Sequence, residues 1–351
     1  MTSSLVRPPS RLRRVWTALL LALLVVVVGG LGTGALSIAP FDVARVLLSS
    51  VGLVEGEPAS RAMSAVVVDI RLPRVLLALV VGGGLSLAGA VLQGLFRNPL
   101  ADPALIGVST GAAFAVAAGI VLQQAVPVLA VLGHVLSPMA ACAGGVVAIV
   151  VVMALSRRSG TTQMGTLLLA GVAINALSAA GLGFLLFIAD DAQLRDITFW
   201  MLGSLSGATW SSVAVTVPVV VVCGAGLQRM APVLDAMCLG ESAAGHLGIR
   251  VEQAKRICIL LSAVVVGATV STCGAIGFVG LVVPHLWRLW IGPQHQRLLP
   301  GATVLGAVLL LAADVIARSA FAPAEMPVGI VTSLLGAPFF LWLLSRRRGV
   351  V

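Results

Sequence analysis

The polar residues of this chain offer few of the groups that enzymes use for catalysis. A nucleotide-binding P-loop needs a Gly-Lys-Ser/Thr triplet, because its lysine reaches the β- and γ-phosphates. The only lysine in the sequence is Lys255, and Ala254 precedes it. The HExxH pattern is also missing. We therefore expect no catalytic residue, and any ATP hydrolysis is expected in a partner chain.

The histidines and cysteines are too scattered to form a metal or redox motif. No two of the five cysteines lie within a few residues of each other, which excludes a CxxC pair. The four histidines are equally dispersed, at His134, His246, His285 and His295. We expect no metal site and no permanently bound cofactor.

A carboxylate inside an apolar span would indicate a proton-coupled carrier. Asp314 comes nearest to this description, because it lies within an apolar run, and Arg318 follows four residues later. On a helix this spacing places both side chains on one face. We expect a local ion pair near the outer surface or, alternatively, a docking site for a partner. Without a carboxylate deep in a span, an external energy source is favoured.

The composition shows which kind of protein must position these residues. Apolar residues make up 59% of the 351 residues and charged residues only 10%, and the mean hydropathy is +1.10. A soluble domain carries roughly 25% charged residues, because it needs a polar surface. The composition therefore excludes a cytosolic enzyme, a disordered chain and a secreted disulfide scaffold. It predicts an all-α polytopic membrane protein.

About ten apolar segments are expected to cross the membrane as helices, because backbone groups in lipid must be satisfied internally. The segment 276–291 is short and contains Gly277, Gly280 and Pro284, so we expect a broken helix there. The ten predicted spans are residues 15–36, 74–96, 104–123, 136–156, 166–188, 211–229, 256–273, 276–291, 300–320 and 327–345.

The basic residues predict the orientation of these spans. If the N-terminus is cytoplasmic and ten spans alternate, sixteen of the 22 Arg and Lys residues fall on the cytoplasmic side. This bias follows the positive-inside rule, so both termini are predicted to be cytoplasmic. Membrane topology thus explains the net charge of +9, and no nucleic-acid partner is expected. The predicted parts are a cytoplasmic segment (1–14), one transmembrane domain (15–345) and a cytoplasmic tail (346–351).

Three groups of motifs resemble the FecCD family of ABC importer permeases. They are RLPR (71–74) with RNPLADP (97–103), the segment 239–248, and GFVGLVVPH (277–285) with GAPFF (336–340). The resemblance covers nearly the whole chain. It implies a type II ABC importer permease fold and a homodimer in the lipid bilayer of the bacterial inner membrane. It also implies two partners, a cytoplasmic ATPase dimer that binds ATP and Mg and a periplasmic substrate-binding protein.

The longest cytoplasmic loop, residues 230–255, is the predicted contact with the ATPase. The spacing of Leu239, Ala243 or Ala244, and Leu247 would place apolar side chains on one face of a short helix. The alternative is an ordinary helix between two spans. The resemblance implies a coupling role for Leu239, Gly240, Glu241, Ala244 and Gly248.

Three arginines on the outer face are the predicted docking site for the binding protein. Charges at a rim steer a partner and set its register, and in similar permeases arginines at these motifs receive glutamates of a binding protein. The alternative is that they snorkel to the interface. The three residues are Arg71, Arg74 and Arg318.

Two short segments are the predicted cytoplasmic gate. Asn98 and Leu100 flank a proline that stops the preceding helix, so irregular backbone lies at the membrane surface. In the family this turn helps to close the inner end of the pathway. Met164 and Gly165 match a second gating loop by position, although the family often has small polar residues there.

The predicted cargo is haem, because the segments 97–112 and 193–204 look most like those of haem permeases. A guanidinium at Arg195, at the outer end of the fifth span, could bind a haem propionate. The alternative is a local pair with Asp191 or Asp196. A ferric siderophore or cobalamin remains an alternative cargo, and a self-sufficient ion-coupled carrier or channel is the alternative class of protein.

Overall fold

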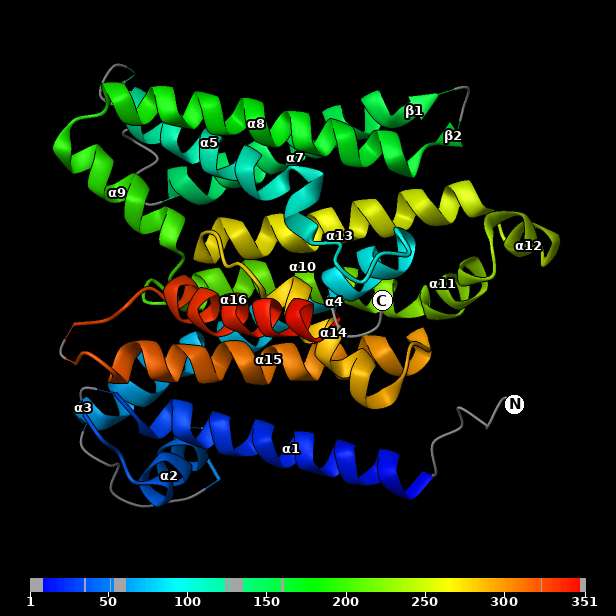
Figure 1. Cartoon of the computed structure of the whole chain (residues 1–351). Helices are drawn as coiled ribbons and strands as arrows, with labels where there is room; N and C mark the ends of the chain where they lie inside the picture. The colour runs from blue at the N-terminus through cyan, green and yellow to red at the C-terminus, as the bar shows by residue number, and fades with distance from the viewer. Residues whose placement is uncertain are drawn as a thin grey trace.

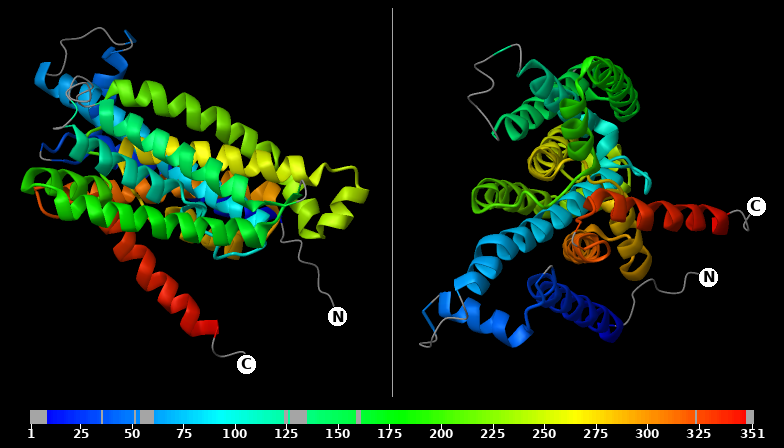
Figure 2. Two further views of the ribbon diagram at one scale, coloured as in Figure 1. Left: turned by 90° about the horizontal axis from the view of Figure 1, so that it is seen from above. Right: turned by 90° about the vertical axis from the view of Figure 1, so that its left-hand side faces the viewer.

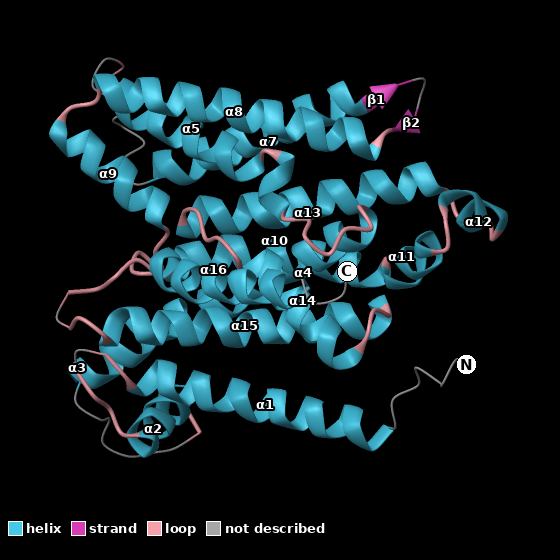
Figure 3. Cartoon of the chain, viewed as in Figure 1, coloured by secondary structure: helices cyan, strands magenta, loops and turns pink. Residues whose placement is uncertain are grey.

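The chain folds as a bundle of helices, as expected for a backbone that must satisfy its hydrogen bonds within the membrane (Figure 3). The computed structural model describes residues 9–34, 36–50, 52–53, 61–123, 126, 135–158, 161–322 and 324–347. Most of the predicted terminal segments 1–14 and 346–351 therefore lies outside the described residues. Among the described residues the strands are limited to a two-residue pair, β1 (Arg157–Arg158) and β2 (Thr161–Thr162).

Ten apolar helices correspond to the ten predicted spans, which confirms the polytopic all-α class. Seven of them in the described part of the chain are long and apolar enough to cross a membrane, and three are shorter. Their bounds are α1 Pro9–Gly32, α4 Leu72–Leu95, α5 Val108–Leu122, α7 Leu136–Ser156, α8 Met164–Ile188, α10 Trp210–Arg229, α13 Val251–Cys273, α14 Val279–Ile291, α15 His295–Ser319 and α16 Val328–Arg347.

Short helices join these spans, and the hydropathy pattern did not predict them all. Most of them lie at the two ends of the bundle, which we call the α9 end and the α12 end (Figure 1). The short helices are α2 Pro40–Ser50, α3 Arg61–Ser64, the π-helix η1 Ala65–Arg71, the 3-10 helix η2 Pro103–Ile106, α9 Asp191–Leu202, α11 Ala231–Cys238 and α12 Glu241–His246.

Helix α4 lies at the centre of the bundle, and every residue from Val81 to Leu95 is buried. Glycines allow its neighbours to approach closely. A Cβ atom at Gly82 would lie 2.3 Å from the carbonyl oxygen of Gly306 in α15, and one at Gly89 would lie 1.8 Å from that of Gly280 in α14. Small residues at such positions let helix backbones pack directly against each other. The core of the monomer is therefore built on α4.

The predicted segment 276–291 is a short helix, as expected, but it is not broken at Gly280 or Pro284, because both lie inside α14 and the irregular backbone precedes the helix. Helix α13 ends at Cys273, and α14 begins only at Val279. Gly274 and Phe278 both have positive φ angles, of 71° and 67°. With 13 residues, α14 is about 20 Å long, which is shorter than the ~30 Å hydrocarbon layer. The Cys273 carbonyl accepts a hydrogen bond from the Ser204 N–H at 2.8 Å, so the broken backbone is satisfied within the protein.

Helices α8 and α16 leave large apolar side chains uncovered. The C-terminal part of α16 projects away from the bundle (Figure 2), although Val328 and Val331 in its first turns are buried. Leu334 and Leu341 farther along α16 are exposed, as are Leu177 and Phe187 of α8. These faces of the monomer are suited to lipid or to another polypeptide, because both offer apolar contacts.

A buried ion cluster joins α4 to α15 at the α9 end of the bundle. The Asp314 side chain is 0% exposed and accepts hydrogen bonds from Arg74 Nε at 3.0 and 3.1 Å, and Arg74 Nη2 lies 2.9 Å from its Oδ1. Arg318 Nε lies 3.5 Å away. Arg74 also binds Glu325 at 2.8 Å. The expected Asp314–Arg318 pair is present, but it is part of a larger buried cluster, because Asp314 also binds Arg74 of α4.

Two arginines of the same region bind the backbone carbonyls at the C-terminal end of α1. The Arg71 guanidinium donates hydrogen bonds to the carbonyls of Leu31 at 2.7 Å and Gly32 at 3.0 Å. Arg318 donates to the carbonyl of Gly30 at 2.7 Å. The last carbonyls of a helix have no partner within the helix, and they form the negative end of its dipole. These cations therefore anchor α1 to η1 and α15.

The Asp314→Asn substitution should destabilise the protein strongly. Removing one partner of a buried ion pair leaves an uncompensated charge and costs about 3–5 kcal/mol, here at Arg74 and Arg318. Thermal unfolding of the purified protein in detergent should show a clearly lower Tm. Asp69→Asn is the matched control, because Asp69 is exposed. Equal Tm values for the two variants would contradict the structural role of the cluster.

Candidate functional site

The loop between α10 and α13 forms two short helices at the α12 end of the bundle. Helix α11 ends before Gly240, which has a φ of +122°, and Gly248 after α12 has a φ of +82°. A Cβ atom would meet nothing within 4 Å at either glycine. Leu239 and Leu247 are 73% and 67% exposed. Two large apolar side chains on an outward-facing loop provide a contact surface for another protein.

The two faces of α12 differ from the predicted arrangement. Ala244 is fully buried in the main core, whereas Ala243 is exposed together with Leu239 and Leu247. The expectation that Ala244 belongs to the exposed apolar face is therefore wrong. The reason is helix geometry: Ala243 and Leu247 lie one turn apart and share a face, whereas Ala244 is rotated by one residue and faces the bundle. The Ala244 side chain fixes α12 to the bundle instead.

Glu241, at the start of α12, binds Lys255 in the first turns of α13. The distance from Glu241 Oε2 to Lys255 Nζ is 2.7 Å. Lys255 also donates a hydrogen bond to the Thr162 carbonyl at 3.3 Å. Glu252 accepts hydrogen bonds from the N–H group and the hydroxyl of the same threonine. The β1–β2 hairpin is thus attached to α13, and through Lys255 to α12.

The second predicted gate segment follows this hairpin directly. Met164 is the first residue of α8, and its side chain packs against the main core. Gly165 is exposed, with open space where a Cβ atom would lie. The Gln163 carbonyl accepts a hydrogen bond from the Leu167 N–H at 2.9 Å. The hairpin and the first turn of α8 are therefore continuous.

The first predicted gate segment is a tight turn after α4. Asn98 is exposed, and its side-chain oxygen accepts a hydrogen bond from the Leu100 N–H at 3.0 Å. The preceding Arg97 has a φ of 50°. Asp102 caps η2 by accepting a hydrogen bond from the Ala104 N–H at 2.7 Å. Burial raises the pKa of the Asp102 carboxyl, and the hydrogen bond from Ala104 acts in the opposite direction.

Helix η2 joins the first gate segment to the middle of α8. The Asn175 side chain donates a hydrogen bond to the Ala104 carbonyl at 3.1 Å. A Cβ atom at Gly171 would lie 1.9 Å from the Leu105 carbonyl oxygen, so η2 lies directly on the α8 backbone. The structure therefore links both predicted gate segments to α8, one at its start and one at its middle.

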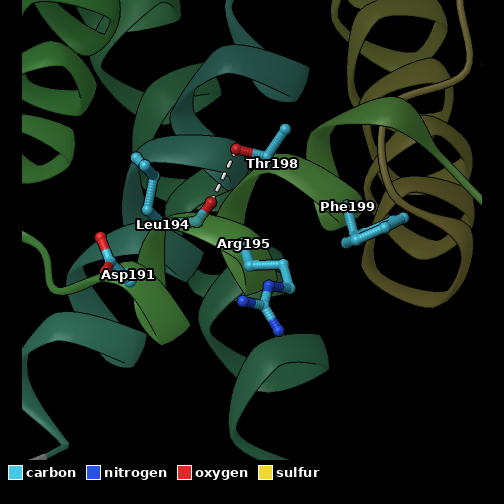
Figure 4. A pocket seen from close by; sticks show the side chains of 5 residues that line it. All are labelled: Asp191, Leu194, Arg195, Thr198 and Phe199. Atoms are coloured by element: carbon cyan, nitrogen blue, oxygen red, sulfur yellow. Dashed lines mark hydrogen bonds between the residues drawn. The ribbon is translucent and has the colours of Figure 1, made fainter.

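Arg195 lies on the exposed face of α9, at the opposite end of the bundle. Asp190 and Gln193 form a capping box that starts this helix. One face of α9 lines a shallow pocket, and the Arg195 guanidinium lies apart from the Asp191 carboxylate (Figure 4). Among the described residues, neither Asp191 nor Asp196 forms an ion pair with Arg195. The guanidinium is accessible to an anionic group. The pocket residues are Asp191, Leu194, Arg195, Thr198 and Phe199.

The three arginines predicted to dock a binding protein lie inside the monomer. Arg71, Arg74 and Arg318 are 5%, 7% and 5% exposed. The expectation of exposed cations at the outer rim is therefore wrong. These arginines are buried because they bind Asp314 and the C-terminal carbonyls of α1. Glu325 is the acidic member of the cluster that reaches the surface. The docking role of the arginines stays a prediction.

Sequence reasoning missed Lys255, Glu252 and Thr162 as a connected group. Two signals were available in the sequence. Lys255 is the only lysine, and Glu252 precedes it by three residues, so a helix places both on one face. The position of Thr162 could not be inferred, because its contact with Lys255 spans 93 residues of chain.

The ten apolar helices of the described residues, with two exposed leucines on a loop at one end, indicate a multi-pass membrane protein. The comparisons with known proteins identify it more closely. The sequence profile of the FecCD transport family matches residues 20–346. The chain belongs to this family.

Two relatives and one solved structure illustrate the similarity. The chain is 46% identical to the hemin transport system permease protein HmuU of Yersinia pestis, over 94% of this chain and 95% of that protein. It is 45% identical to the cobalamin import system permease protein BtuC of Halobacterium salinarum, over 80% of this chain and 74% of that protein. The structure of an inward-facing metal-chelate type ABC transporter matches with a TM-score of 0.82 and 32% identity, covering 95% of this chain and 99% of that one. The type II ABC importer permease fold is thereby confirmed.

Proposed function

We propose that this permease imports haem from the periplasm to the cytoplasm, with energy from a separate ATPase subunit. The observation that supports haem is the 46% identity to a hemin permease over almost the whole length of both chains. The accessible Arg195 guanidinium in the α9 pocket agrees with this cargo, because an arginine can bind a carboxylate through two parallel hydrogen bonds. The alternative cargo is cobalamin or a ferric siderophore, and the similarity to a cobalamin permease supports the former.

In this proposal the ATPase dimer binds at the α12 end. The exposed Leu239 and Leu247 provide apolar contacts, and Gly240 and Gly248 allow α12 to change its angle. The α12 end then faces the cytoplasm, as the excess of basic residues in the predicted cytoplasmic loops requires. Both termini are cytoplasmic in this orientation, and the membrane is the bacterial inner membrane.

The α9 end then faces the periplasm and receives the binding protein. The proposed first contact for cargo is Arg195 in the α9 pocket. At the same end of the bundle, Glu325 is the exposed member of the ion cluster around Arg74. A second copy of the chain would cover the exposed apolar faces of α8 and α16. The pathway is proposed to lie between the two copies.

The cargo is tested by uptake in a strain that lacks this chain. Expression of the chain together with its ATPase and binding protein should restore uptake of haem and leave ferric siderophore and cobalamin uptake at background. Restored uptake of cobalamin or the siderophore, without haem, would replace the proposed cargo. The three substrates are compared with the same strain carrying an empty vector.

The Leu239→Glu/Leu247→Glu variant should lose its ATPase subunit. Two charges on the contact surface would be buried without a partner, which is unfavourable. Co-purification of the ATPase with the tagged permease should fall to near zero, while the Tm of the permease alone stays unchanged. Leu53→Glu, at a position that is 73% exposed in the loop after α2, is the control. Normal co-purification would exclude this docking surface.

The Arg195→Ala variant should weaken haem transport selectively. A hydrogen-bonded contact with a charged group contributes ~1.5–3 kcal/mol, so the KM for haem should rise at least about tenfold. Asp191→Asn on the same face of α9 should have little effect, and Arg195→Lys should have an intermediate one. An unchanged KM for haem would remove Arg195 from the pathway.

Vesicles that contain only this chain should accumulate no cargo, with or without a pH gradient. Addition of the ATPase subunit, binding protein and ATP should start uptake, because the chain has no P-loop of its own. An ion-coupled carrier would behave in the opposite way and concentrate haem without nucleotide. Empty vesicles are the control for haem partitioning into lipid.

A further inference from the structure

Lys255 occupies an unusual position for the only lysine of the chain. It is 5% exposed, yet it lies close to the α12 end, where water is available. Its ammonium group contacts two separate elements, Glu241 of α12 at 2.7 Å and the carbonyl of Thr162 in β2 at 3.3 Å. A buried ammonium needs such partners, because an unpaired charge in a protein interior is strongly unfavourable.

Each polar atom of the hairpin residue Thr162 forms a hydrogen bond with a side chain of α13. Lys255 binds its carbonyl, and Glu252 accepts hydrogen bonds from its N–H group at 2.9 Å and from its hydroxyl. Arg256 Nε lies 3.0 Å from Glu252 and keeps that carboxylate in place. Thr162 is itself 2% exposed. Its backbone therefore has to follow any displacement of Lys255 and Glu252.

Helix α12 is bounded by a glycine at each end. The glycines at both of its ends have positive φ angles and open space around them. The buried Ala244 side chain and the ion pair of Glu241 hold it against the bundle. A shift of α12 that moved Glu241 away would leave Lys255 buried with only a carbonyl as partner. The charge attraction thus resists separation and transmits the shift.

Thr162 lies two residues before Met164, the first residue of α8 and a predicted gate residue. The hydrogen bond from the Leu167 N–H to the Gln163 carbonyl continues the rigid connection into the helix. A continuous series of short polar contacts therefore runs from Glu241 through Lys255 and Thr162 to the start of α8. One end of this series lies on the proposed ATPase contact, and the other lies at the predicted gate segment of α8.

We propose that Lys255 is a positioning residue that couples movement of α12 to the gate at the start of α8. The inference rests on the proposed function, since it assumes that an ATPase subunit moves α12. Lys255 contacts neither cargo nor nucleotide in this proposal. Its role is to make α12 and the β1–β2 hairpin move together, so that nucleotide-driven displacement of the loop opens or closes the pathway.

The test compares Lys255→Met, Glu241→Gln and the double variant in vesicles that hold the complete complex with its binding protein. ATP hydrolysis and haem uptake are measured in the same sample. Loss of the link should lower uptake at least about tenfold while ATP hydrolysis continues, so more ATP is consumed per haem. Because one link is broken in each case, the double variant should match the single variants. Lys255→Arg, which keeps the charge, should restore part of the uptake.

Arg229→Met is the matched control, because it removes one exposed positive charge at the same end of the bundle. It should leave the ratio of ATP to haem unchanged. A normal ratio in both Lys255→Met and Glu241→Gln would overturn the proposal, as would additive effects in the double variant. If Lys255→Met fails to assemble, Glu241→Gln decides, because the Glu241 side chain is half-exposed and its amide fits the same space.

Failure of the proposed function gives a different result. The unmodified complex would then show no ATP-dependent uptake of haem, cobalamin or a ferric siderophore. Failure of the coupling role leaves the unmodified complex active and the variants equally active. The two outcomes are therefore separated by the unmodified sample.

Discussion

A charge or an unpaired backbone group inside a membrane protein must find its partner within the protein, and this constraint explains the main features of the chain. Asp314 and Arg74 pair in the interior, and Arg71 and Arg318 bind the last carbonyls of α1. The same requirement holds where the helices break, as at Cys273, whose carbonyl binds Ser204. Charged groups therefore connect helices that the apolar surface alone would not orient.

The two ends of the bundle use this constraint differently. At the α9 end, the buried arginines bind Asp314 and the last carbonyls of α1, and these contacts hold α1, α4 and α15 together. At the α12 end, Lys255 joins α12, which is bounded by flexible glycines, to the hairpin that precedes α8. A rigid end and a linked but movable end agree with a permease whose motion begins at the α12 loop. The membership of the chain in the FecCD transport family agrees with this interpretation.

Much of the fold could be predicted because membrane spans leave a strong local signal. Each of the ten apolar segments became a helix, and the short eighth segment is the short helix α14. The coupling and gate residues stay predictions that rest on the motifs of the family. The burial of Arg71 and Arg74, however, contradicted the expectation of an exposed rim. A sequence shows that an arginine lies near the end of a span, but not which partner lies across from it.

The sequence by itself determined the class of protein, the number of spans and the family, because hydropathy and short motifs depend on residues that are neighbours in the chain. Only the tertiary structure decided the pairing of Arg74 with Asp314, 240 residues apart, and of Lys255 with Thr162, 93 residues apart. It also decided that Ala244 faces inward while Leu239 faces outward. The physical reason is that each of these outcomes depends on how separate helices pack, and packing brings together residues whose contact no local pattern specifies.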